Sequence, residues 1–136
     1  MKKYLNIAMI YAAAAMIGGV FYREFTKCYQ YTGMTALGKV HTHLFILGMI
    51  VFLIVALYAK NMKLEEKKTF RPFMILYNIG LAGMAVMLIV RGVPQVMGTA
   101  LSSAASAMIS GIAGLAHICL GIGIVLLIVT FQKCAE

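Results

Sequence analysis

Charged residues are scarce in this chain of 136 residues: they make up 12% of it, and only four of them are acidic. Soluble domains average about 25% charged residues and about 45–50% apolar residues. Here hydrophobic residues supply 62% of the chain. This composition excludes an ordinary soluble domain and predicts a membrane protein, with the lipid bilayer as its main partner.

The few charges are also unevenly distributed. Four stretches contain no Asp, Glu, Lys or Arg: residues 4–22, 40–59, 72–90 and 108–131. Each is long enough to cross a bilayer, whose hydrocarbon core needs about 20 helical residues. The stretches do not alternate apolar and polar residues, so we expect helices and not the strands of a β-barrel. The predicted fold is all-α: an integral membrane up-and-down four-helix bundle that forms one membrane domain over residues 1–136.

The first stretch follows Lys2 and Lys3 and resembles the charged start and apolar middle of a signal peptide. Its apolar run does not end in a clean small-x-small cleavage site followed by a polar mature segment. We therefore interpret it as a retained span, which completes the bundle.

The basic residues predict the orientation, because cytoplasmic segments carry an excess of Lys and Arg. With the N-terminus inside, the inner side holds eight of them: Lys2, Lys3, Lys60, Lys63, Lys67, Lys68, Arg71 and Lys133. The outer side holds four: Arg23, Lys27, Lys39 and Arg91. This favours N-in/C-in topology in a bacterial cytoplasmic membrane. The net charge of +8 then reflects topology and anionic lipid, and indicates no nucleic-acid partner.

The two outer connections are the less polar ones. In the second, residues 91–107, a turn is expected at Gly92-Val93-Pro94. The segment after it either extends the fourth helix outward or lies in the membrane interface. Either connection could cover an outward-facing site.

The three cysteines do not form a disulfide framework. Cys28 is expected outside, Cys119 inside the fourth span and Cys134 at the inner tail, so the topology keeps them apart. The eleven methionines are scattered through all spans, which favours flexible packing over a copper pathway.

Three histidines are the ionisable side chains within the spans: His41, His43 and His117. Such residues suggest function, because burying them in lipid is costly. His43 lies 17 residues before Lys60 and His117 lies 16 before Lys133, which places both about 24–26 Å from the inner charges. Their helices run in the same direction and are expected diagonally across the bundle, so the two rings could face each other across its axis.

The residues around His117 are mostly small: Ala113, Gly114, Leu120 and Gly121 lie three or four positions away on its face. This predicts a groove beside the ring, although small residues also serve close helix packing. A groove with an imidazole ligand favours haem b (heme b), an iron porphyrin. A bare ion would require more ligands than the spans offer, since they contain no carboxylate. An ion or proton site and a structural hydrogen bond remain the alternatives.

His41 should face the other side of its helix, together with Gly38 and Gly48. Three interpretations stay open for this face. It could contact another subunit in a homo-oligomer, hold a second haem through one protein ligand, or lie near the head groups. Asn6 and Asn78 are interpreted as inter-helix hydrogen-bonding residues.

The segment His41-Thr42-His43-Leu44-Phe45-Ile46-Leu47-Gly48 resembles the His-x-His helix of haem-copper oxidase subunit I. The whole chain resembles a family of small four-helix bacterial membrane proteins of unassigned function. The oxidase resemblance implies His41 as ligand of a high-spin haem, and His43 with His117 as ligands of a low-spin haem. The further histidines of the oxidase copper site are missing, so reduction of oxygen to water is not expected.

Charges at the outer rim suit a haem whose propionates point outward: Arg91, Lys39 and Arg23 end or begin spans. Such residues also commonly reach lipid head groups. Three tyrosines could bond a cofactor edge or serve the membrane interface: Tyr11, Tyr22 and Tyr77.

The sequence thus predicts a small bis-histidine cytochrome that passes electrons between a membrane donor such as quinol and a partner. A second haem at His41 would add reactivity toward a gas or peroxide. The alternatives are a transporter of metal ions or small molecules, and an accessory membrane subunit with structural histidines. Catalytic residues are not identified.

Overall fold

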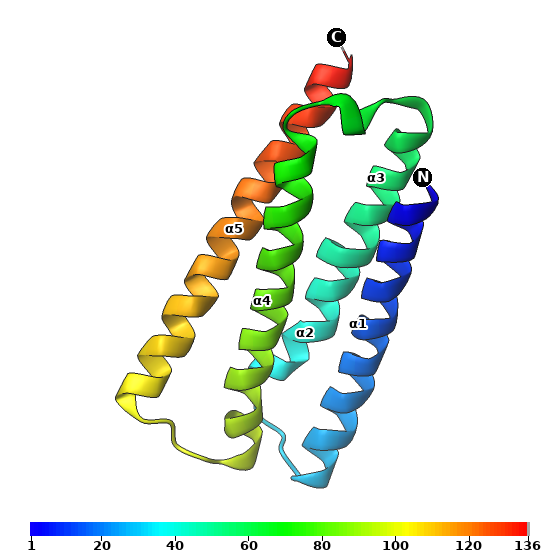
Figure 1. The fold of residues 1–136 in the computed structure, drawn as a ribbon. Coiled ribbons are helices and arrows are strands. Elements are labelled where there is room, and N and C mark those ends of the chain that lie inside the picture. Colours follow the sequence, from blue (N-terminus) through cyan, green and yellow to red (C-terminus); the bar gives the residue numbers. More distant parts are fainter. Residues whose placement is uncertain (136) are drawn as a thin grey trace.

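The computed structural model describes residues 1–135, and within that range every regular element is a helix (Figure 1). Four helices are long and apolar enough to cross a membrane: α1 (Lys2–Cys28), the second span Ala36–Asn61, α4 (Phe70–Met97) and α5 (Ser103–Ala135). The second span is composite, built from η1 (Ala36–Lys39), α2 (Val40–His43), η2 (Leu44–Ile50) and α3 (Val51–Asn61). A short helix, η3 (Leu64–Glu66), lies in the connection after it. The predicted all-α four-helix bundle is confirmed, and each predicted span lies within a longer helix.

The chain runs up and down, and both termini lie at one end of the bundle together with η3 (Figure 1). We call this the terminal end. Helix α1 packs along the second span, and α5 packs mainly along α4. Helix α4 also contacts the second span, so it is the common neighbour of α5 and of the histidine-bearing α2. In Figure 1, α5 leans away from the other helices toward the end opposite the termini.

Glycines let α4 and α5 approach closely. A Cβ atom added to Gly80 would lie 2.6 Å from the backbone nitrogen of Leu120. One added to Gly123 would lie 2.9 Å from the Cβ of Tyr77. Small residues at such crossings allow the dense packing that associates helices in lipid, where no hydrophobic force does so.

The prediction of a turn at Gly92-Val93-Pro94 is wrong. Helix α4 continues through Pro94 to Met97 and ends at Gly98, whose φ of 67° is left-handed and suits glycine. Gly92 instead serves packing, because a Cβ there would be 2.5 Å from the backbone nitrogen of Leu37. After Gly98, the next helix, α5, begins at Ser103, and the carbonyl of Ser102 accepts from the amide of Ser106 in its first turn. The segment before the fourth predicted span therefore extends that helix from Ser103 onward.

Aromatic side chains form much of the core. Phe52, Phe73 and Tyr77 are fully buried, and their ring centroids lie 5.3–6.2 Å apart in pairs. Large aliphatic side chains are exposed on the outer faces of all four spans, with Ile17, Leu57 and others among them. Such faces suit contact with lipid, so the chain is a multi-pass membrane protein.

Candidate functional site

The start of the second span is attached to the end of α4. The Thr35 hydroxyl donates to the Gly92 carbonyl at 3.1 Å, and the Ala36 amide donates to Gln95 Oε1 at 2.8 Å. The Thr35 oxygen also accepts from the Leu37 amide, which begins η1. These bonds position η1, and therefore the following α2 with its histidines, against α4.

His43 is half-buried and opens onto a hollow of about 240 Å³ that Thr42, Ile46 and Leu47 also line. Its Nδ1 lies 2.7 Å from the carbonyl oxygen of Lys39, one turn earlier. A carbonyl can only accept, so this bond places the proton on Nδ1. The neutral ring then presents an unprotonated Nε2, which is the form that binds metals.

His117 has the same arrangement on α5. Its Nδ1 lies 2.7 Å from the carbonyl oxygen of Ala113, again one turn earlier. The ring is exposed at the side of α5 and lines a hollow of about 120 Å³. The other lining residues come from α4 and α5: Met84, Met87, Leu88, Arg91 and Ala113.

The glycines expected to leave a groove beside His117 lie on an exposed side of α5. A Cβ atom added to Gly114 or Gly121 would have no neighbour within 4 Å, so the surface there is open. Leu120, in contrast, is buried against α4. Of these neighbours of His117, the two glycines therefore leave clearance and Leu120 provides contact between helices.

The stacked pair Tyr58 and Phe131 gives a common reference for the heights of the two histidines. These rings join α3 to α5 with centroids 4.2 Å apart. His43 lies 15 residues before Tyr58, and His117 lies 14 residues before Phe131, so helical rise predicts that both lie about 21–23 Å from the stack. Fourteen residues also make almost four full helical turns, so His117 lies on nearly the same face of α5 as Phe131.

His41 lies on the α1 side of the second span. Its ring stacks on Tyr22 with centroids 6.3 Å apart, and it lies against Gly19. The Nδ1 atom is buried and has no hydrogen-bond partner among the described residues. The ring is therefore enclosed by α1 and not directed toward α5.

The glycine row proposed as a contact between subunits is occupied within the chain. Gly38 lies against Tyr22, and Gly48 lies against Tyr11. Both tyrosines belong to α1. This correction follows from packing: α1 fills the face of the second span that the small residues leave shallow.

Arg91 is the rim cation that shares a hollow with a histidine. Its Nη2 donates to the Ser110 hydroxyl at 2.6 Å, so the guanidinium is held beside His117. The side chain of Lys39 is exposed, although its carbonyl accepts the His43 bond. Arg23 is exposed and lies 3.8 Å from Glu24.

The core tyrosines bond to the protein itself. The Tyr77 hydroxyl donates to the Leu47 carbonyl at 2.8 Å, and the Tyr11 hydroxyl donates to Asn78 Oδ1 at 2.6 Å. The interpretation of Asn78 as an inter-helix residue agrees with this bond, whereas Asn6 is exposed. The role of Tyr77 was not found from sequence, because its acceptor is a backbone carbonyl that carries no sequence signal.

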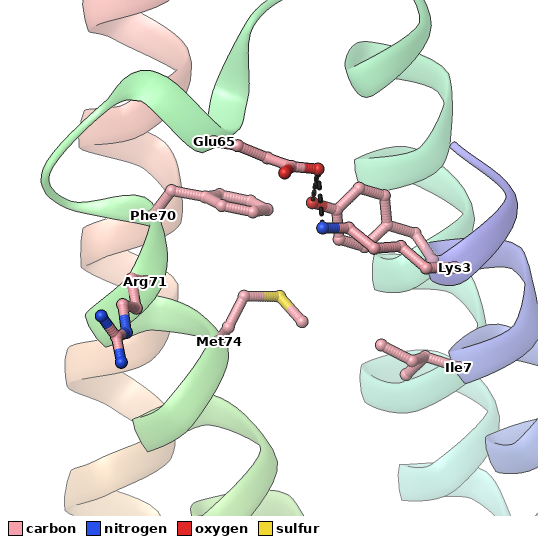
Figure 2. Close-up of a pocket in the computed structure, with 7 residues that line it drawn as sticks. Lys3, Ile7, Glu65, Phe70, Arg71 and Met74 are labelled. Carbon is pink, nitrogen blue, oxygen red and sulfur yellow. Dashed lines mark hydrogen bonds and ion pairs between the residues drawn. The ribbon is translucent and has the colours of Figure 1, made fainter.

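A cavity of about 320 Å³ lies at the terminal end, and none of the three histidines lines it (Figure 2). Glu65 reaches across it to the Lys3 ammonium at 2.7 Å and to the Tyr4 hydroxyl at 2.8 Å. The hydrogen bonds from Lys3 and Tyr4 lower the pKa of the Glu65 carboxyl. Ile7, Phe70, Met74 and the cationic Arg71 complete the walls. We interpret this region as an ion-paired joint between α1 and η3 and not as a ligand site for iron.

Within residues 1–135, no three or more His, Cys, Asp or Glu side chains gather as an ion site would require. His43 and His117 each open onto a separate hollow, whereas His41 is enclosed by α1. Cys28 is exposed, while Cys119 and Cys134 are partly buried, and all three are free thiols.

The profile of the family described as "Protein of unknown function (DUF2871)" matches residues 1–134. The chain belongs to this family. No curated protein and no solved structure matches it. The family description names no activity.

Proposed function

We propose that this protein is a small membrane cytochrome that holds haem b between His43 and His117. The observation that carries the proposal is the matched pair of Nδ1 bonds, each 2.7 Å long and each to the carbonyl four residues earlier. Such a bond orients a ligating histidine, fixes its tautomer and raises the basicity of the other nitrogen. Two neutral imidazoles prepared in this way are suitable axial ligands for haem iron.

The surroundings of His117 also suit a porphyrin. Met84, Met87 and Leu88 supply apolar and adaptable walls. Arg91 supplies a planar cation that can grip a propionate. The open surface at Gly114 and Gly121 leaves clearance along the helix, as a flat ring requires.

Two axial histidines would leave the iron no open position, which favours electron transfer over ligand chemistry. When bound, the haem supplies one-electron redox chemistry, and the chain supplies ligands, an apolar setting and a positive charge. We infer that electrons pass between a membrane donor such as quinol and a protein partner. The chain has three histidines in all, which are too few to form the oxidase copper site in addition to a haem site.

A metal-ion carrier and an accessory subunit are the rival functions. A carrier for zinc or a similar ion would need three or four converging ligands, whereas the histidines here are separated on two helices. An accessory subunit would need no free Nε2. In both rings, however, Nδ1 bonds to a carbonyl of the same helix, and Nε2 is left without a partner among the described residues.

The deciding experiment is purification in mild detergent from cells supplied with haem. We expect coloured protein with a low-spin bis-histidine spectrum. His43→Ala and His117→Ala should each lose haem or convert it to the high-spin form, because one axial bond is removed. Asn6→Ala, at an exposed position in the first span, is the matched control and should leave the spectrum unchanged.

Colourless wild-type protein, or wild-type spectra from both histidine variants, would overturn the haem proposal. Binding of zinc or copper by colourless protein would favour the carrier. The second haem implied for His41 is tested in the same preparation. His41→Ala should lower the ratio of haem to protein if a second haem is present and leave it at one if His41 only packs on α1.

A further inference from the structure

The second span contains a π-helical turn directly after His43. This turn, η2, covers Leu44–Ile50 and has α-helix on both sides. Its hydrogen bonds span five residues where α-helical ones span four, so the turn takes in an extra residue. In an α-helix each residue rotates the chain by about 100°. One added residue therefore changes the direction of His43 relative to α3 by that amount.

Two tyrosines from neighbouring helices contact this turn. The buried Tyr77 of α4 donates its hydroxyl to the Leu47 carbonyl at 2.8 Å. Tyr11 of α1 lies so close to Gly48 that a Cβ atom there would be 2.6 Å from its Cγ. An irregular turn leaves carbonyl groups without a regular helical donor, and in lipid each needs another one. The Tyr77 hydroxyl provides a donor to one carbonyl of this turn, that of Leu47.

The extra residue also gives the two histidines the same helical spacing from the stacked rings of Tyr58 and Phe131. His43 precedes Tyr58 by 15 residues and His117 precedes Phe131 by 14. With one residue taken up by the π turn, both histidines stand 14 helical positions from the stacked Tyr58 and Phe131. A continuous α-helix would instead rotate His43 about 100° away from that equivalent position.

We propose that Tyr77 is a positioning residue for the haem ligand His43. Its hydroxyl holds the π turn, and the π turn directs His43 toward the side that faces α5. This inference rests on the haem function proposed above, and it assigns a role to a side chain that would not touch the haem iron.

The test compares Tyr77→Phe with Tyr58→Phe, a control that removes the same hydroxyl from an exposed ring. A second variant deletes Ile46, which is exposed within the turn, so that the span can continue as an α-helix. We expect Tyr77→Phe and the deletion to lower the low-spin fraction several-fold by electron paramagnetic resonance, with His117 retaining haem. Tyr58→Phe should keep the wild-type spectrum.

A second measurement needs no haem. In the haem-free protein, amide hydrogen exchange in residues 44–51 should be at least tenfold faster in Tyr77→Phe than in Tyr58→Phe. Wild-type protein that binds low-spin haem, combined with an unchanged spin state in Tyr77→Phe, would overturn the positioning role and leave the haem site standing. Unchanged exchange would overturn it as well. Wild-type protein without haem would overturn the haem function, and the positioning role with it.

Discussion

At the scale of single residues, the main physical problem is a polar ring in an apolar bilayer. An imidazole N–H without a partner is costly there. His43 and His117 each meet that need through the carbonyl one turn earlier on their own helix. The other nitrogen then stays free for a ligand. His41 differs, because its buried Nδ1 has no partner among the described residues.

Arg91 provides the prediction at this scale. Arg91→Leu removes the cation beside His117, and a charge-assisted bond of this kind contributes about 1.5–3 kcal/mol. We therefore expect haem affinity to fall roughly 10- to 100-fold. The reduction potential should also fall, because a nearby positive charge favours the reduced iron. Haem titration and spectroelectrochemistry would measure both.

Arg23→Leu is the matched control, since Arg23 is predicted on the same side of the membrane and its side chain is exposed. It should leave affinity and potential unchanged. Equal effects of the two variants would indicate a general surface charge effect and contradict a propionate contact at Arg91.

At the scale of helices, the close packing of α4 against α5 depends on glycines, which have no side chain. Gly80 on α4 meets backbone atoms of Leu120 and Ala116, which cannot move aside as a flexible side chain could. The pair holds Met84 and Arg91 beside His117. Close contact of these two helices is thus a condition for the hollow at the histidine.

Gly80→Ala should destabilise the protein by about 1–3 kcal/mol, as is typical when a methyl group is forced into a filled space. Gly111→Ala is the control, because a Cβ there would have no neighbour within 4 Å. Alanine favours a helix over glycine by up to about 1 kcal/mol, so Gly111→Ala should be neutral or stabilising. Thermal unfolding in detergent measures both, and equal midpoints would contradict tight contact at Gly80.

At the scale of the whole molecule, orientation decides which side of the membrane the histidines approach. Both termini and η3 share one end (Figure 1), and the excess of basic residues predicts that this end lies inside. In that orientation the histidines would lie in the outer half. Electrons from a quinol would have to be delivered near that side.

The native cysteines test this orientation. Cys28 ends α1 at one end of the bundle, and Cys134 lies near the end of α5 at the other. With the other two cysteines replaced by serine, Cys28 should react with a membrane-impermeant thiol reagent on intact cells. Cys134 should react only after lysis. The reverse pattern would contradict the N-in/C-in prediction.

Composition and spacing alone determined the membrane class and the four spans, and they predict nearly equal heights for His43 and His117. These properties follow from run length and helical rise, which are local. They also indicated small neighbours beside His117, and the structure shows that Gly114 and Gly121 are not covered by another helix.

Only the tertiary structure decided which faces are covered. In the structure α1 covers Gly38 and Gly48, α4 ends at Gly98 and not at the turn predicted from Gly92, and a π turn follows His43. Each result depends on a contact between residues far apart in sequence: Gly92 with Leu37, or the Tyr77 hydroxyl with the Leu47 carbonyl. A sequence pattern shows which residues are present but not which of them are in contact in the fold. Those contacts determine where a helix bends or ends and in which direction a ligating side chain points.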